Sequence, residues 1–434
     1  MSIWIKGGDL VDPERGVIEQ SDLIVERGII AKILPRGTFR DAGPRLRVID
    51  ASGKHVVPGL VDMHVHLREP GEEYKETIAT GAKAGVVGGY TSLACMPNTI
   101  PPNDCSSVTE FILRQAQKAG LARVYPIGAI TVGQKGDVLT EFGDMKKAGA
   151  VGVSEDGYSV ANSELMRRAM EYARFHNLTV ICHCEDTRLS AGGSMHEGVV
   201  STRIGLPGIP SASEEIMVFR EIALARLTGT PVHIAHVSTE GSVNLIRRAR
   251  EDGLPVTCET APHYFHLDHN AVIGYDTRFK VNPPLRTSAD VEAIKRGLSE
   301  GVIDVIATDH APHSPMEKDL EFDRAACGMI GLETALPLTL ALVKEGVFGM
   351  AEALRRLSYN PSKILGIPGG VLRVGGLADL SVIDAEMEYA MKEEDFHSKS
   401  KNSPFIGMPL RGRNDLTMIG GKIVWQRDTA HIDR

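Results

Sequence analysis

Short runs of apolar, β-branched residues alternate with longer amphipathic segments through the middle of the chain. Strands that are buried on both faces have near-continuous apolar runs, whereas helices that cover a sheet carry an apolar stripe every three to four residues. The pattern predicts eight strands, at residues 60–66, 90–95, 123–129, 150–155, 179–183, 232–236, 255–259 and 303–308. Helical patterns lie between them, most clearly at residues 76–87, 106–119, 163–176, 213–227 and 240–251. Eight strands alternating with helices indicate an α/β fold, a parallel (β/α)8 barrel of the TIM type.

The two ends of the chain have a different pattern. Residues 1–54 contain short alternating strands separated by Gly, Pro and Asp, and residues 366–434 return to that character, with a hairpin signal at the glycine pair 420–421. We therefore expect both ends to form one small β domain, a β-sandwich, beside a barrel made of residues 55–365. The polar stretch at residues 392–402 is expected to lie on the surface.

Composition and charge narrow the function classes. The 434 residues carry a net charge of −8 and no basic runs, which argues against nucleic acid or an acidic membrane surface as the main partner. No signal-peptide pattern starts the sequence and no apolar run approaches the ~20 residues of a membrane span, so we expect a cytoplasmic protein. The six cysteines include no Cys-x-x-Cys pair, and Cys182 and Cys184 face away from His183 on a strand. Buried thiols are therefore expected rather than a thiolate metal site.

The first predicted barrel strand ends in a candidate site. His64, His66 and Arg68 alternate there, and residues two apart on a strand point to the same face. Two imidazoles on one face can hold a metal ion, and an arginine beside them can hold an anionic ligand. This combination suggests hydrolytic chemistry on a small acidic molecule.

Further candidates lie at the carboxyl ends of other strands, where barrels of this kind collect their functional groups. A single histidine or aspartate at such a place is most often structural or a helix cap, but six at matching strand ends are hard to explain by chance. Such ligands suit zinc, and also manganese or cobalt. Six exceed what one tetrahedral zinc needs, so the number suggests two ions ~3.5–4 Å apart that share a carboxylate. The six are His64, His66, Asp156, His183, His236 and Asp309.

Two of the acidic positions are candidates for specific roles. Asp309 can hold a metal, take a proton from an activated water and pass it to a leaving nitrogen, and such proton transfer typically contributes ~10²–10⁴-fold to a rate. Asp156 is the candidate metal ligand after the fourth predicted strand, with Glu155 beside it as an alternative. Strand alternation sends these two neighbouring side chains opposite ways, so only one of them is expected to reach the metals.

The motifs together resemble those of dihydroorotases of the bacterial class I type, within the amidohydrolase superfamily. The His-x-His element alone marks only the superfamily, but the combination is specific and extends over essentially the whole chain. The motifs are His64-Val-His66-Leu-Arg68-Glu-Pro-Gly71, Met96-Pro-Asn98-Thr99, His183-Cys-Glu-Asp186, His236-Val-Ser238, Asn282-Pro-Pro-Leu-Arg286 and Thr308-Asp309-His310-Ala-Pro-His313. The resemblance implies zinc-dependent, reversible cyclisation of N-carbamoyl-L-aspartate to dihydroorotate in pyrimidine biosynthesis. It implies attack of a metal-bound hydroxide on the cyclic amide, with Asp309 as the proton shuttle.

The resemblance also implies roles for single residues. One zinc would be bound by His64, His66 and Asp309, the other by His183 and His236, with Asp156 as the bridge. The substrate-binding set would be His66, Arg68, Asn98, Asn282, His313, Cys327 and Gly328. Many relatives bridge their metals with a carboxylated lysine, but the fourth strand of this chain has no lysine after Lys147. Because an aspartate is shorter, we expect that one of the two metal sites can be partly occupied.

Two other functions remain open at this stage. Hydantoinases and allantoinases act on other cyclic amides, but Arg68, Asn98 and Asp156 favour a dihydroorotase. A non-catalytic dihydroorotase-like subunit that scaffolds aspartate transcarbamoylase would be expected to have lost metal ligands, and all six are present. A homodimer and a complex with that transferase are both compatible with the sequence. The polar segment 311–328, which follows the last ligand, is expected to form a mobile lid.

Overall fold

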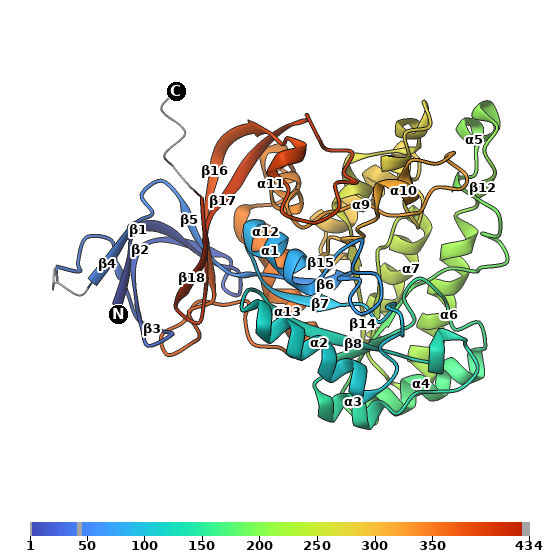
Figure 1. Cartoon of the computed structure of the whole chain (residues 1–434), viewed down its shortest axis with the longest axis horizontal. Coiled ribbons are helices and arrows are strands. Elements are labelled where there is room, and N and C mark those ends of the chain that lie inside the picture. Colours follow the sequence, from blue (N-terminus) through green and yellow to red (C-terminus); the bar gives the residue numbers. More distant parts are fainter. Residues whose placement is uncertain (1, 41–45, 428–434) are drawn as a thin grey trace.

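The barrel consists of eight parallel strands that lie in the sheet in the same order as in the chain. They are β6 (Leu60–Val65), β7 (Tyr90–Cys95), β8 (Arg123–Ala129), β9 (Gly152–Ser154), β10 (Thr179–Cys182), β13 (Val232–Ile234), β14 (Val256–Thr260) and β15 (Val305–Ile306). A parallel bridge between Val65 and His310 joins β6 to the segment after β15 and nearly closes the ring. This computed structural model, which describes residues 2–40 and 46–427, confirms the predicted (β/α)8 barrel (Figure 1).

Helices cover the outside of the ring. Five of them lie within two residues of the predicted segments: α1 (Ile78–Val87), α2 (Ser106–Ala119), α4 (Ser163–Phe175), α6 (Ala212–Thr228) and α7 (Glu240–Glu251). The others are α3 (Phe142–Ala148), α5 (Val199–Ile204), α8 (Pro262–His266), α9 (Ser288–Ser299), α10 (Pro315–Lys318), α11 (Ala335–Glu345), α12 (Met350–Leu354) and α13 (Asn360–Leu365). Threonine caps mark three of the starts, since Thr77 accepts from the amide of Thr80, Thr239 from that of Ser242 and Thr287 from that of Asp290. Among the described helices, none is both long and apolar enough to cross a membrane.

A separate sheet domain lies beside the barrel and combines both ends of the chain (Figure 1). Its strands are β1 (Ser2–Asp12), β2 (Val17–Glu26), β3 (Ile29–Pro35), β4 (Leu46–Asp50), β5 (His55–Pro58), β16 (Leu380–Ala390), β17 (Pro409–Ile419) and β18 (Lys422–Gln426). The order is β18-β17-β16-β5-β1-β2-β3, with β4 paired to β1. The β17–β18 hairpin turns at Gly420 and Gly421 as predicted, and the sheet curves until Gly420 lies against Gly28 of the β2–β3 turn. An apolar core fills the space between the two halves of the sheet.

The division between the two domains differs from the predicted one in two places. β5 pairs with β1 and β16, so the sheet extends four residues past the expected boundary at residue 54. The segment between β16 and β17 leaves the sheet and packs on the barrel, where Ser398, Ser400 and Asn402 are buried. The prediction that residues 392–402 form a surface segment is therefore wrong for these three, because their polar side chains bond to the barrel rather than to water. The predicted β domain also takes in residues 1, 41–45 and 428–434, which lie outside the described residues.

An apolar layer fills the barrel interior below its carboxyl-terminal end. Met63, Ile127, Ile181 and Val305 are fully buried there, each from a different strand. Two small strands, β11 (Met195–His196) and β12 (Gly208–Ile209), pair in the insertion after β10. Because barrel strands are short and held on both sides, their carboxyl ends are fixed points from which side chains can converge.

Candidate active site

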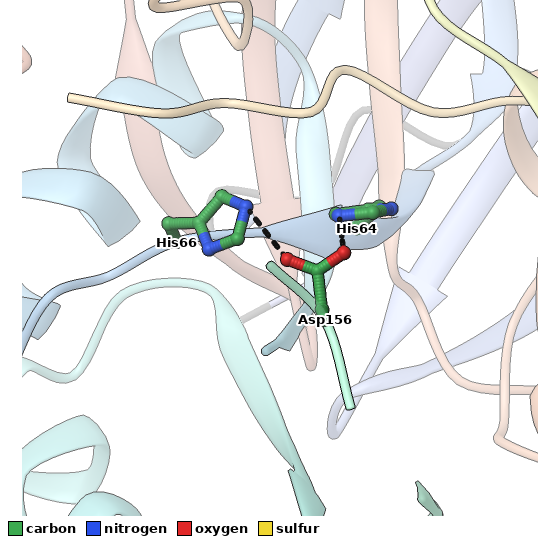
Figure 2. Close-up of side chains that lie close together, drawn as sticks. All are labelled: His64, His66 and Asp156. Atoms are coloured by element: carbon green, nitrogen blue, oxygen red, sulfur yellow. Dashed lines mark ion pairs between the residues drawn. The ribbon is translucent and has the colours of Figure 1, made fainter. Parts of the chain in front are cut away.

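Two buried histidines lie at the carboxyl-terminal end of the first barrel strand, β6. His64 is fully buried and its Nδ1 lies 2.6 Å from Oε1 of Glu259, which accepts its proton and leaves Nε2 with a free lone pair. His66 is held the same way, because its Nδ1 lies 2.8 Å from Oδ1 of Asn98. The two Nε2 atoms face Asp156, at 3.3 Å from Oδ1 and 3.4 Å from Oδ2 (Figure 2). One carboxylate therefore lies between two imidazoles with one oxygen toward each.

Asp156, and not its neighbour, is the carboxylate that enters this cluster. Glu155 points away and accepts hydrogen bonds from the amides of Ile130 and Thr131, both at 3.0 Å. Asp156 is 4% exposed. The alternative that Glu155 reaches the centre is thus not supported by the structure, and strand alternation separates the two as expected.

A second pair of histidines approaches Asp156 from the other side. His183 Nδ1 and His236 Nε2 lie 2.7 Å apart, and they are 3.6 and 3.7 Å from Oδ1 of Asp156. Nε2 of His183 lies 2.9 Å from Oε2 of Glu185, so this carboxylate fixes the proton on the far side of the ring. Two groups of three potential ligands result, one with His64 and His66 and one with His183 and His236, and Asp156 belongs to both.

Asp309 completes the first group. Its Oδ1 lies 3.2 Å from Nε2 of His66 and 3.6 Å from Nε2 of His64. Asp309, His236 and Arg68 all have positive φ angles, of 48°, 34° and 61°. Side-chain-bearing residues seldom adopt this backbone region, and such strained conformations cluster where a site must aim a side chain.

The electrostatics of the cluster are those of a cation site. Burial disfavours the ionised carboxylate of Asp156, but the imidazoles around it outweigh this and hold its pKa well below its usual range. The same balance lowers the pKa of Asp309. Burial also disfavours the imidazolium of His183, yet Asp156 and Glu185 raise its pKa to about 10. Positive charge is therefore strongly favoured between these carboxylates, and a metal ion would compete with protons for the same lone pairs.

The donor set fits divalent metal ions. Nε2 of His64 is buried and has no hydrogen-bond partner among the described residues, although burial of an unpartnered polar atom is costly. It faces Asp156 and Asp309, so a cation in that position would satisfy it. Imidazole nitrogens and carboxylate oxygens are the ligands that zinc prefers in hydrolytic sites. The cluster can thus hold metal.

A buried cation lies next to the cluster. Arg68 is 7% exposed, donates from Nε to the carbonyl of Pro312 at 3.2 Å, and has Nη2 3.3 Å from Nε2 of His313. His313 Nε2 also lies 2.8 Å from the carbonyl of Cys327, to which it donates. Burial and the positive charge of Arg68 lower the pKa of His313 to about 2, so this ring stays neutral. The structure therefore brings together Arg68, His313 and Cys327, three residues of the expected substrate-binding set, and their contact with substrate stays a prediction.

The remaining predicted substrate contacts lie around the same opening but are engaged within the protein. Asn98 holds His66, and Nδ2 of Asn282 donates to Oε2 of Glu185 at 3.0 Å. Gly328 donates its amide to the carbonyl of Lys280 at 2.8 Å. The φ of Gly328 is 133°, and a Cβ there would lie 2.6 Å from Ala311, so only glycine suits this position.

Two buried lysines bond to the backbone of the segment predicted to be a lid, Lys318 from within the segment and Lys280 from outside it. Nζ of Lys318 donates to the carbonyls of Ala326 at 2.8 Å and Gly328 at 3.1 Å. Nζ of Lys280 donates to the carbonyls of Asp323 at 2.9 Å and Ala325 at 2.8 Å. These bonds connect residues 318, 323, 325, 326 and 328 with one another or with Lys280. Motion of this segment stays a prediction.

Three further side chains support the site without belonging to the six expected metal ligands. Glu185 supports His183, Glu259 supports His64, and Asn402 donates to the carbonyls of Ala311 at 3.0 Å and Gly328 at 3.1 Å. The role of Glu185 could have been expected from the sequence, because Glu185 is two residues from His183. Glu259 ends the predicted strand 255–259, and this position at a strand end made a supporting role expected. The contacts of Asn402 join residues more than 70 positions apart, and one sequence carries no signal for them.

Known proteins resemble this chain over nearly its whole length. Residues 53–242 match a family model described as dihydro-orotase-like. A dihydroorotase of Syntrophobacter fumaroxidans is 54% identical over 419 residues, which are 96% of this chain and 95% of the relative. A dihydroorotase of Geobacter metallireducens is 51% identical over 427 residues, 98% of this chain and 100% of the relative.

Solved structures agree on the architecture. The L-hydantoinase (dihydropyrimidinase) of Arthrobacter aurescens superposes with a TM-score of 0.86 at 26% identity, covering 98% of this chain and 96% of the other. The dihydropyrimidinase of Brevibacillus agri NCHU1002, at 21% identity, has a TM-score of 0.82 over 98% of this chain and 95% of its own, and shows the shared fold alone. The full-length relatives at about 50% identity decide the family: the chain belongs to the dihydroorotases, which are cyclic-amide hydrolases.

Proposed function

We propose that this protein interconverts dihydroorotate and N-carbamoyl-L-aspartate, a step of pyrimidine biosynthesis. The observation that carries the proposal is the buried guanidinium of Arg68 beside the cluster of His64, His66, Asp156 and Asp309. The substrate of this reaction has a carboxylate on the same ring as the amide that opens. A planar guanidinium can bind that carboxylate with two parallel hydrogen bonds and leave the amide facing the cluster.

We propose zinc as the metal, with two ions per chain. His64, His66 and Asp309 would hold one ion, His183 and His236 the other, and Asp156 would bridge them. Support comes from the geometry, because Asp156 is within 4 Å of all four histidines. When bound, zinc polarises a carbonyl oxygen and lowers the pKa of water to about 7.

The chain's own residues then have three tasks. Asp309, ionised because its pKa is held low, would accept the proton of the attacking water and deliver it to the ring nitrogen that leaves. Arg68 would orient the substrate carboxylate, with Asn98 and His313 beside it. Glu259 and Glu185 would keep the rings of His64 and His183 turned toward the metals. In the direction of cyclisation the same groups would act in reverse order.

Removal and return of metal tests the proposed function. We expect the purified protein to open dihydroorotate and to cyclise N-carbamoyl-L-aspartate, to lose both activities after treatment with a chelator, and to regain them with zinc. A protein that binds zinc but turns over neither compound would contradict the proposal and favour a scaffolding role with aspartate transcarbamoylase.

The number of ions is tested separately. Replacement Asp156→Asn should lower the zinc content at saturation from two ions to one or fewer, because both groups of ligands share this carboxylate. Glu155→Gln, on the neighbouring residue that points away, is the matched control and should keep the wild-type content. Equal zinc content in wild type and Asp156→Asn would contradict the bridging role.

A further inference from the structure

The connection between β16 and β17 leaves the sheet domain and lies on the loops at the carboxyl-terminal end of the barrel. We call residues 396–405 of this connection the strap. Phe396 and Phe405, at its two ends, are buried in one apolar cluster with residues of the barrel. The strap between them is polar, but three of its polar side chains are buried: Ser398, Ser400 and Asn402. Buried polar groups need hydrogen-bond partners, so the bonds of these three side chains decide where the strap lies.

Two of the three side chains fasten the strap to the loop between β6 and α1. Oγ of Ser400 donates to the carbonyl of Lys75 at 2.7 Å. Oγ of Ser398 donates to the carboxylate of Glu76, and the amide of Lys399 donates to Oε1 of the same glutamate at 3.1 Å. These bonds hold the strap against the barrel, so its next buried polar side chain has a defined position from which to act.

That side chain, Asn402, joins two segments that carry expected substrate contacts. Its Oδ1 accepts from the amide of His313 at 3.2 Å. Its Nδ2 donates to the carbonyl of Ala311 at 3.0 Å and to that of Gly328 at 3.1 Å. An asparagine offers an acceptor oxygen and an NH₂ group with two donors on a short side chain, and both groups are used here. An ionised aspartate has no proton to donate, so two carbonyls beside one amide select asparagine at this position.

The two segments lie side by side, since the amide of Ala311 donates to the carbonyl of Met329 at 2.9 Å. Asn402 adds a connection between them from the strap, because it bonds the amide of His313 and the carbonyl of Gly328 with one planar group. Buried backbone groups need partners of this kind, so neither segment can move away without leaving a polar group unpaired. The amide of Asn402 therefore constrains how far His313 lies from Gly328.

We propose that Asn402 is a positioning residue for substrate binding, which acts through His313 and Gly328. This role rests on the proposed function, in which Arg68 binds the substrate carboxylate. Nη2 of Arg68 lies 3.3 Å from Nε2 of His313, so a shift of His313 would disturb the place where the carboxylate binds. A misplacement of ~1 Å can cost ~10²-fold in rate where a reaction depends on orientation. The three residues that the Asn402 side chain bonds are not expected metal ligands, so loss of these bonds should weaken substrate binding more than metal binding.

Steady-state kinetics of the zinc-loaded, full-length protein test this role. In Asn402→Asp the carboxylate can still accept from the amide of His313, but it faces the carbonyls of Ala311 and Gly328 without a proton to donate, and these oxygens repel one another. We expect KM for both dihydroorotate and N-carbamoyl-L-aspartate to rise ~10-fold or more, while kcat falls less than about threefold. The zinc content of the variant should equal that of the wild type.

Asn414→Asp is the matched control. Asn414 is 2% exposed, and its Nδ2 donates to the carbonyls of Val86 at 3.2 Å and Val87 at 3.1 Å, where β17 packs on α1. This variant also loses two bonds to backbone carbonyls, but away from the site, and should keep the wild-type KM values. Asn402→Ala removes the amide without adding a charge, and it should raise KM as Asn402→Asp does.

Circular dichroism shows whether each variant has folded. Wild-type KM values in a folded Asn402 variant, or an equal rise of KM in Asn414→Asp, would overturn the positioning role. Failure of both Asn402 variants to fold would overturn it as well, because Asn402 would then serve stability alone. A wild type that turns over neither compound would overturn the proposed function, and the role of Asn402 with it, whereas the other outcomes concern Asn402 alone.

Discussion

The hydrogen bond between His64 and Glu259 offers a sharp test of how this site holds metal. Glu259 is 1% exposed and its two oxygens lie 2.6 Å from Nδ1 of His64 and 3.2 Å from Nε2 of His233. The two imidazoles lower the pKa of Glu259 to about 2 despite its burial, so it is a carboxylate at neutral pH. An anion behind the ring makes Nε2 of His64 a better ligand and fixes its direction.

Replacement Glu259→Gln keeps the size of the side chain and removes the charge. The amide oxygen can still accept from His64, but its NH₂ group faces Nε2 of His233 and forces that ring into its other tautomer. Loss of a partner of this kind typically costs 10–100-fold in metal affinity, which corresponds to ~1.4–2.7 kcal/mol. We therefore expect the zinc dissociation constant of the chelator-treated protein to rise by that factor.

Competition with a chromophoric chelator measures this constant directly. Glu221→Gln is the matched control, because Glu221 is also a buried carboxylate but pairs with Arg220 on α6. A second variant, His233→Asn, should weaken zinc binding less than Glu259→Gln and add little to it in the double variant, since His233 reaches the site only through Glu259. Zinc affinity of Glu259→Gln within twofold of the wild type would refute this reasoning.

Three further predictions concern the proton shuttle, the anion contact and the tethered segment. Asp309→Asn should keep the fold by circular dichroism but lower turnover ~10²–10⁴-fold, and near-normal turnover would remove Asp309 as the proton acceptor. Arg68→Ala should lower kcat/KM for dihydroorotate by about 10²-fold or more while changing little with dihydrouracil, which lacks the carboxylate, and an equal loss on both would argue against the contact. Burial lowers the pKa of Lys318 from 10.5 to about 8, so as pH rises the folded protein releases this proton before the unfolded chain does. The free energy of unfolding of the wild type, measured by chemical denaturation relative to that of Lys318→Met, should therefore increase by about 2 kcal/mol between about pH 8 and pH 10. If the unfolding free energies of the two proteins instead changed in parallel with pH, Lys318 would not be charged and buried in the folded protein.

The barrel was predictable because its strands are buried on both faces and have apolar runs that few other elements share. The ends of the strands were less predictable. The run at 303–308 contains only two paired residues, Val305–Ile306, and the positive φ of Asp309, 48°, lies outside the strand region. His64, His66 and Asp156 could be grouped from strand spacing alone, since parallel strands end at one edge. Alternation also predicted that only one of Asp156 and Glu155 would reach the cluster, whereas the choice of Asp156 rested on the resemblance to known dihydroorotases.

The parts that escaped prediction depend on contacts between distant segments. Residues 392–402 are polar, and polarity alone indicates the surface. In the folded chain, the side chain of Asn402 instead accepts a hydrogen bond from the amide of His313 at 3.2 Å. It also donates to the carbonyls of Ala311 and Gly328. Likewise, Lys280 and Lys318 look like surface lysines in the sequence, yet each is buried and donates to backbone carbonyls of the segment 311–328. Such tethers are set by tertiary geometry, which local patterns do not encode.

A comparison of substrates tests the central claim most directly. The zinc-loaded wild type should be assayed on dihydroorotate, dihydrouracil and allantoin under the same conditions. If Arg68 selects an acidic ring, kcat/KM for dihydroorotate should exceed that for the other two by at least ~10²-fold, since two hydrogen bonds to a charged group contribute ~3 kcal/mol or more. Turnover of dihydrouracil or allantoin as fast as that of dihydroorotate would contradict the account.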